Sequence, residues 1–163
     1  MRVVFDAGVV FSGVGWRGEA HLCLVALARR RVLAFATAQT LEELRRVVDQ
    51  IGFKARHSPY TILDWYYGTV RMVSPAPLGK QRSRDAKDDP YLACALAAQA
   101  GLIVSRDEDL LVLGKPFGVE IITPRGLLTR LAEGSKAESP KVDLDILDQI
   151  AKHRGRRSGG RQS

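Results

Sequence analysis

The sequence predicts an α/β fold in which a central, mainly parallel sheet is flanked by helices in a three-layer sandwich. Short apolar runs alternate along the chain with segments whose apolar residues recur at helical spacing, and this order is typical of a parallel sheet covered on both faces. The chain has 163 residues, of which 45% are hydrophobic, and this is enough for one domain with one buried core.

Local patterns justify each element of this fold. Apolar runs predict strands at residues 3–5, 32–36, 70–73, 102–105 and 120–123. Apolar periodicity predicts helices at residues 19–30, 41–48 and 124–131. Two more helices are predicted to begin at Ser58-Pro59 and at Asp89-Pro90, because a capping residue followed by proline is a common helix start. The second of these helices is expected to end before Gly101.

Residues 1–133 are expected to form the folded domain, because the composition changes after Glu133. Residues 134–140 predict a linker, residues 142–151 a short amphipathic helix, and residues 154–163 a basic disordered tail. From Ile150 onward the chain has five Lys or Arg and no acid. Such a tail is either a solubilising end or a nonspecific contact for phosphate groups.

The sequence excludes several classes of protein. No apolar run approaches the roughly 18 residues that a membrane-spanning helix needs, and Met1-Arg2 leads directly into a predicted strand rather than a signal peptide. Cys23 and Cys94 stand alone in predicted helices and favour small core residues over a disulfide or a metal pair. A reduced, cytoplasmic protein without a membrane segment is therefore expected.

Four acidic residues are expected at one edge of the sheet. Asp6 and Asp107 follow predicted strands, whereas Glu43 and Asp89 lie in the first turn or two of predicted helices. In a parallel sheet the carboxyl ends of the strands and the N-termini of the helices meet at the same edge, where ligands collect. The four side chains therefore predict a single acidic cleft.

Three of these acids also have ordinary structural explanations. Glu43 lies three residues after Thr40, as in a capping box. Asp89 precedes Pro90 and could cap a helix, and Asp107 could cap a short helical turn that follows it. Taken one at a time, these patterns leave both interpretations open.

As a set, the four acids favour a site for divalent cations. Clustered carboxylates repel one another unless a cation neutralises them, and oxygen ligands without His or Cys favour Mg²⁺ or Mn²⁺ over Zn²⁺. Such ions bind phosphate oxygens and lower the pKa of bound water, which suits in-line cleavage of a phosphodiester bond. The formal net charge of +7 is compatible with a polyanionic substrate.

Five segments in sequence order resemble the motifs of PIN-domain nucleases. They are Val3 to Gly13 around Asp6, Thr40 to Leu44 around Glu43, Asp88 to Ala97 around Asp89, Leu102 to Leu111 around Asp107, and Ile121 to Arg125. The resemblance covers roughly residues 1–132. It implies a PIN-like fold and a divalent-metal-dependent endoribonuclease in which Asp6, Glu43, Asp89 and Asp107 bind Mg²⁺ or Mn²⁺ and act in catalysis.

The closest resemblance is to the toxins of prokaryotic toxin-antitoxin pairs, which implies an RNA substrate and an antitoxin partner protein. Asp109 and Asp88 are further candidates for the metal site. The chain departs from the first motif at Ala7 and Gly8, where the family has Thr and Asn, side chains that help to orient the first acid.

Two other functions remain open from the sequence. One is a degenerate PIN domain that binds RNA or a protein without cleavage, as Ala7 and Gly8 would favour. The other is a phosphotransfer enzyme with Asp6 as nucleophile, a class that usually has a second Asp where this chain has Gly8.

Two surface features are also open to more than one interpretation. Residues 29–31 are three arginines that either contact RNA phosphate or complement the dipole at a helix end. Trp65, Tyr66 and Tyr67 cannot all face one core, so at least one of them is expected to be exposed or to lie in an interface, such as that of a homodimer.

Overall fold

The computed structural model describes residues 1–53, 59–79, 89–134 and 146–158, and for residues 153–158 it describes the backbone alone. Asp88, Ser58 and the expected linker at residues 135–140 therefore lie outside the described residues.

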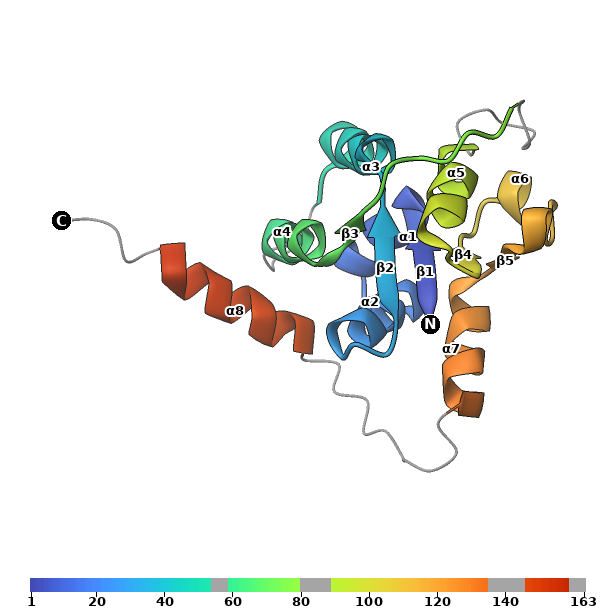
Figure 1. The fold of residues 1–163 in the computed structure, drawn as a ribbon. Helices are drawn as coiled ribbons and strands as arrows, with labels where there is room; N and C mark the ends of the chain where they lie inside the picture. The colour runs from blue at the N-terminus through green and yellow to red at the C-terminus, as the bar shows by residue number, and fades with distance from the viewer. Residues whose placement is uncertain (54–58, 80–88, 135–145, 159–163) are drawn as a thin grey trace.

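The centre of the molecule is a five-stranded sheet in which every strand is parallel to its neighbours (Figure 1). The strands are β1 (Arg2–Phe5), β2 (Leu33–Ala36), β3 (Arg71–Met72), β4 (Leu102–Val104) and β5 (Glu120–Ile122). Their order across the sheet is β3-β2-β1-β4-β5. The α/β prediction is confirmed, and the five predicted strands are present with boundaries that differ by one or two residues.

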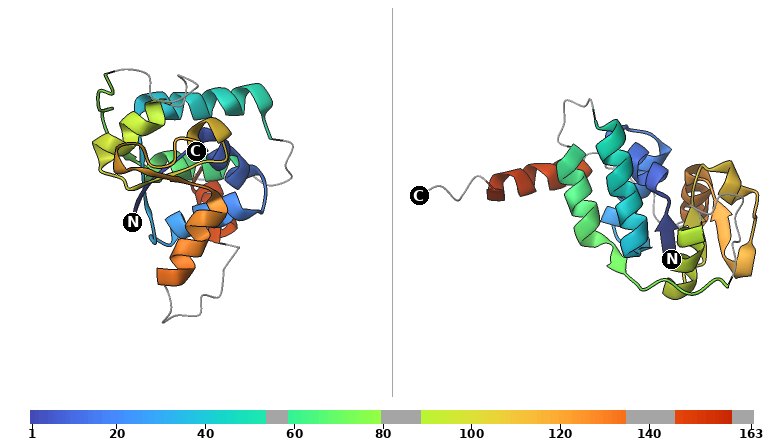
Figure 2. Two further views of the ribbon diagram at one scale, coloured as in Figure 1. Left: turned by 90° about the vertical axis from the view of Figure 1, so that its right-hand side faces the viewer. Right: turned by 90° about the horizontal axis from the view of Figure 1, so that it is seen from above.

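Helices cover both faces of the sheet. They are α1 (Ala7–Gly15), α2 (Glu19–Ala28), α3 (Ala38–Ile51), α4 (Pro59–Thr69), α5 (Asp89–Ala98), α6 (Glu108–Leu111), α7 (Pro124–Gly134) and α8 (Ile146–Ser158), with a 3₁₀ turn at Pro116–Gly118. One face carries α5, which packs on β1, β2 and β4, and the opposite face carries α1 and α2 (Figure 2). None of the helices in the described part of the chain is long and apolar enough to cross a membrane.

The strand order reverses at β1. The chain passes from β1 to β2 and β3 on one side and then returns to place β4 on the other side of β1. In an open parallel sheet, this reversal opens a crevice beyond the carboxyl ends of the two strands that flank it. The ends of β1 and β4 are therefore the part of the sheet where a ligand site is expected.

The core explains why β1 and β4 are short apolar runs. Val3, Val4, Ile103 and Val104 have no exposed surface, because helices cover both faces of the sheet at its centre. Cys23 and Cys94 are buried and free, as the sequence predicted.

Helix α1 was not predicted from the sequence. Its residues include three glycines and three valines, and most positions are buried, so no amphipathic period marks it. Tertiary packing explains Gly13, where a Cβ atom would lie 2.8 Å from the carbonyl oxygen of Ala20 and 2.8 Å from Cδ1 of Leu24. The glycine allows α1 and α2 to approach closely.

Two helix ends differ from the prediction. Helix α3 begins at Ala38, and its capping box joins Thr37 and Thr40, so the alternative interpretation of Glu43 as part of a capping box with Thr40 is wrong. Helix α5 ends at Ala98, and the following residue, Gln99, takes a left-handed φ of 51°, so Gly101 is not the residue that stops it.

Helix α8 extends the folded part of the chain beyond the expected short helix. It continues to Ser158, so the predicted disorder is wrong for residues 154–158. Its Leu147 is fully buried, and Asp148 forms an ion pair with Arg17. Because α8 also packs against α4 and α2, its first turns belong to the same packed body as the sheet.

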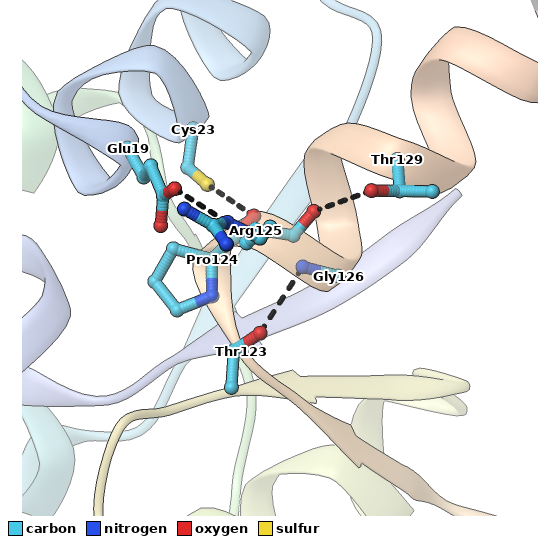
Figure 3. A network of polar contacts seen from close by, with 7 residues as sticks. All are labelled: Glu19, Cys23, Thr123, Pro124, Arg125, Gly126 and Thr129. Carbon is cyan, nitrogen blue, oxygen red and sulfur yellow. Dashed lines mark hydrogen bonds and ion pairs between the residues drawn. The ribbon is translucent and has the colours of Figure 1, made fainter.

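The start of α7 is fixed on α2 by polar contacts (Figure 3). Arg125 Nε donates to Glu19 Oε1 at 2.8 Å, and Cys23 Sγ donates to the carbonyl oxygen of Pro124 at 3.6 Å. Thr123 Oγ1 accepts from the backbone N–H of Gly126 at 3.1 Å. The segment after β5 therefore holds the start of α7 against α2.

The arginine run and the aromatic run also have structural roles. Arg31 donates to the carbonyl oxygen of Leu131 at 2.8 Å, which favours a helix-end role over an RNA contact for this residue. Trp65 and Tyr66 are buried, and Tyr67 is half-buried, so two of the three side chains belong to the core.

Candidate functional site

The reversal of strand order places two sequence motifs side by side. Asp6 follows β1, and Ser105 follows β4. The two strands are in register from Val3 with Leu102 to Phe5 with Val104, and the backbone N–H of Asp6 donates to the carbonyl oxygen of Val104 at 3.0 Å. Asp6 and Ser105 therefore leave the sheet as neighbours.

A chain of hydrogen bonds joins Asp6 to Asp107 through Ser105. Ser105 Oγ donates to Asp6 Oδ2 at 2.6 Å and accepts from the backbone N–H of Asp107 at 2.9 Å. Asp107 Oδ1 in turn accepts from the backbone N–H of Asp109 at 2.9 Å, which caps α6. The predicted capping role of Asp107 is thus real, and it coexists with a position beside Asp6.

Asp6 itself caps α1. Its Oδ1 accepts from the backbone N–H of Gly8 at 3.4 Å, and its backbone is extended, as at other helix N-caps. Both oxygens of the carboxylate therefore have a donor, and the group is held at the junction between β1 and α1.

Tyr91 connects Glu43 to the same junction. Its hydroxyl donates to Glu43 Oε2 at 2.8 Å and accepts from the backbone N–H of Ala7 at 3.2 Å. The three residues come from α3, α5 and α1, so one buried phenol fixes three helices at the carboxyl edge of the sheet. Glu43, in the second turn of α3, is therefore linked through Tyr91 to Ala7, the residue that follows Asp6.

The remaining predicted acids lie at the same edge. Asp89 is the first residue of α5, two residues before Tyr91, and Asp109 is the second residue of α6, two residues after the cap Asp107. Both side chains are partly buried. The structure therefore joins Asp6 to Asp107 by hydrogen bonds and Glu43 to Ala7 through Tyr91, and it places Asp89 and Asp109 at the N-termini of adjoining helices.

Burial and charge perturb two groups of the site. Burial raises the pKa of Asp6 above its ordinary value of 3.8, the hydrogen bonds from Ser105 and Gly8 oppose this shift, and the charge of Asp107 adds to it. Burial also raises the pKa of Tyr91, with further contributions from the charges of Asp6 and Glu43. Three acids therefore share one electrostatic environment, and Tyr91 remains a protonated donor.

The donor set suits a hard divalent cation. Carboxylate oxygens are the ligands that Mg²⁺ and Mn²⁺ prefer, and the repulsion between Asp6 and Asp107 is of the kind that a cation relieves. Among the residues that the structure describes, no three His, Cys, Asp or Glu side chains are grouped closely enough to hold an ion.

Ser105 and Tyr91 are residues of the candidate site that the sequence analysis did not assign. Ser105 could have been found, because it stands two residues before Asp107 at the end of a predicted strand. Tyr91 gave no such signal, since an aromatic residue in an apolar helix is usually a core residue. Its buried hydroxyl needs polar partners, and only the tertiary structure shows which ones they are.

Comparison with known proteins shows the family of this chain. Residues 2–109 match the sequence profile of the PIN domain, and the chain belongs to the PIN-domain family. PIN domains are generally nucleases that use divalent metals.

A solved structure shows the same fold. The crystal structure of PAE2754 from Pyrobaculum aerophilum is similar with a TM-score of 0.56 and 18% sequence identity, over 82% of this chain and 90% of that chain. No curated protein matches the sequence.

Replacing Tyr91 with Phe should lower the free energy of unfolding by about 1–3 kcal/mol, because the Ala7 N–H and Glu43 lose a buried partner. Chemical denaturation measures this change, and Tyr60→Phe, at an exposed tyrosine, is the matched control. Equal stability of the two variants would show that the Tyr91 hydroxyl does not support the site.

Replacing Asp6 with Asn should stabilise the metal-free protein at neutral pH. Because the pKa of Asp6 is raised in the folded protein, ionising the carboxyl disfavours the folded state. This cost is absent below the ordinary pKa, grows as the pH rises towards the raised pKa and is complete above it. Thermal melts in chelator from acid to neutral pH should therefore show a gain for the variant that disappears in acid. A gain of equal size at every pH would contradict this explanation.

Proposed function

We propose that this protein is a Mg²⁺- or Mn²⁺-dependent endoribonuclease that cleaves RNA phosphodiester bonds. The observation that supports this most directly is the hydrogen-bonded chain from Asp6 through Ser105 to Asp107 at the reversal of strand order. Helix capping accounts for Asp6 and Asp107 one at a time, but it does not account for the placement of the two acids together, where the charge of Asp107 adds to the raised pKa of Asp6.

In this proposal Asp6, Glu43, Asp89 and Asp107 hold the cation, with Asp109 as a further ligand. The ion, when bound, would neutralise phosphate oxygens and lower the pKa of an attacking water. Ser105 holds the carboxylate of Asp6 towards β4, and Tyr91 holds that of Glu43 towards α1. These contacts fix two acids before substrate arrives, which reduces the reorganisation that binding requires.

Further parts of the proposal concern partners and location. The net charge of +7 supports a polyanionic partner such as RNA. The motif resemblance supports a toxin role with an antitoxin protein as inhibitor, a cytoplasmic location and a homodimer. Co-purification with the product of a neighbouring gene, and measurement of the mass in solution, would test the two protein partners.

A second candidate is a PIN domain that binds RNA or a protein without cleaving. Ala7 and Gly8 in the first motif favour it, as does the spacing of the described acids. A titration with Mn²⁺ separates the two functions, because a scaffold without activity has no need to bind the ion tightly.

RNA cleavage should require Mg²⁺ or Mn²⁺ and should stop with excess chelator, since carboxylates alone cannot activate water. Asp107→Asn and Glu43→Gln should each lose most of the activity while the proteins remain folded. Glu42→Gln, at the exposed neighbour of Glu43 on α3, is the matched control and should retain it. Robust cleavage in EDTA would overturn the proposed mechanism.

Gly8→Asn should raise the affinity for Mn²⁺ or the cleavage rate by about 10- to 100-fold, the effect typical of side chains that orient metal ligands. Gly8 lies in α1 without a left-handed φ, and a Cβ atom there meets nothing within 4 Å, so Asn fits the fold. Isothermal titration and RNA cleavage measure the two effects. A folded variant with no gain in either would favour the candidate without activity.

A further inference from the structure

Four aromatic side chains form a continuous row of ring contacts beside the end of α1 that is away from Asp6. Phe11 lies against Trp16 at 5.6 Å between ring centroids and is stacked on Phe53 at 4.8 Å, and Phe53 meets Tyr60 edge-on at 5.5 Å. We refer to these four residues as the aromatic step. They come from α1, the loop after α3 and the start of α4.

The outer rings of the aromatic step are exposed. Phe11 is buried, whereas Trp16 is 60% exposed and Tyr60 is 53% exposed. Buried Phe11 and half-buried Phe53 hold the two outer rings in place, so the exposed rings are already ordered before any ligand binds. Exposing an ordered indole to water is unfavourable, and exposed tryptophans are a common feature of binding surfaces.

Helix α1 connects the aromatic step directly to the acidic site. Asp6 is the N-cap of this nine-residue helix and Trp16 is its C-cap. At a rise of about 1.5 Å per residue, the two caps are roughly 15 Å apart along the helix axis. Gly8 is exposed and Ser12, four residues further on, is partly exposed, so the face of α1 next to Asp6 presents small residues. At the far end of this helix the ring of Phe53 lies against Gly15, where a Cβ atom would be 3.1 Å from Phe53 Cδ1.

A small hollow beside Trp16 is lined in part by a buried histidine that has an unpartnered ring nitrogen. The hollow has a volume of about 50 Å³, and Trp16, Arg17 and His21 contribute to its lining. His21 Nδ1 lies 2.8 Å from the carbonyl oxygen of Gly13, which can only accept, so Nδ1 carries the proton. Nε2 of this buried ring has no partner among the described residues. The hollow is too small for a whole nucleobase but can admit an amino group or a water.

We propose that the aromatic step is a base-stacking site for single-stranded nucleic acid. The inference rests on the proposed function, because it places bases of the substrate a few nucleotides from the scissile phosphate. Exposed aromatic side chains stack on unpaired bases largely without regard to sequence, whereas a duplex keeps its bases stacked on each other. The sugar-phosphate backbone of the bound strand would follow the small-residue face of α1 from Asp6 towards Trp16. The net charge of +7 favours a polyanion over an uncharged apolar peptide as the occupant.

The test is a binding measurement on the full chain in EDTA, where cleavage is stopped. The probe is a short single-stranded oligouridylate, compared with an abasic oligomer of equal length. Trp16→Ala should weaken binding of the oligouridylate roughly 5- to 150-fold, the range for loss of one stacked base, and should leave the weaker binding of the abasic oligomer unchanged. Ile51→Ala, which shortens an exposed apolar side chain at the end of α3, is the matched control and should bind as the wild type does.

Two further variants distinguish stacking from apolar contact. Trp16→Leu keeps an apolar side chain without an aromatic face and should bind as weakly as Trp16→Ala, whereas Trp16→Phe should retain part of the affinity. The oligouridylate should also quench tryptophan emission in the wild type but not in Trp16→Phe, since the remaining Trp65 is buried.

Unchanged affinity in Trp16→Ala, or wild-type affinity in Trp16→Leu, would overturn the proposal and would favour an apolar protein segment as the occupant. The proposed function fails separately: a protein that binds the oligouridylate through Trp16 but never cleaves RNA with Mn²⁺ would keep the stacking site and lose the nuclease.

Discussion

The candidate site depends on the contact between the carboxyl ends of β1 and β4. Because the strand order reverses at β1, two segments about a hundred residues apart leave the sheet side by side, and the Asp6 N–H donates to the Val104 carbonyl. The strands at this point are fully buried, so their backbone positions are fixed by packing on both faces. Ser105 follows β4 and is fully buried, and its hydroxyl bridges Asp6 and the backbone of Asp107.

The cost of this arrangement is electrostatic. Burial and the charge of Asp107 disfavour the ionised form of Asp6, and only part of this is offset by donors from Ser105 and Gly8. A structural acid is normally placed where its neighbours favour its charge. An acid whose surroundings disfavour its ionised form is a common feature of functional sites. A bound cation would stabilise the ionised form of Asp6.

Helix α1 links the chemistry to the surface that we assign to substrate. One end is capped by the perturbed acid and the other by an exposed indole, while Gly13 lets the helix sit tightly on α2. The apolar periodicity of the sequence did not predict this helix, since it is buried on most sides and rich in glycine and valine. Its composition serves close packing and an open face, and both are properties of the assembled fold rather than of an isolated helix.

The sequence by itself determined the alternation of strands and helices, the positions of the acids at the ends of strands and starts of helices, and the motif order of the PIN family. These are local features, because apolar period and helix starts are encoded within a few residues. It could not decide between capping and function for Glu43, since Thr37 and Thr40 form the capping box and Glu43 instead meets Tyr91 from another helix. Only the tertiary structure decided three other contacts: the pairing of Asp6 with Ser105, the contacts of Tyr91 with Glu43 and Ala7, and the stacking of Phe11 on Phe53. Each of them joins residues that are far apart along the chain, so no local sequence pattern can indicate it.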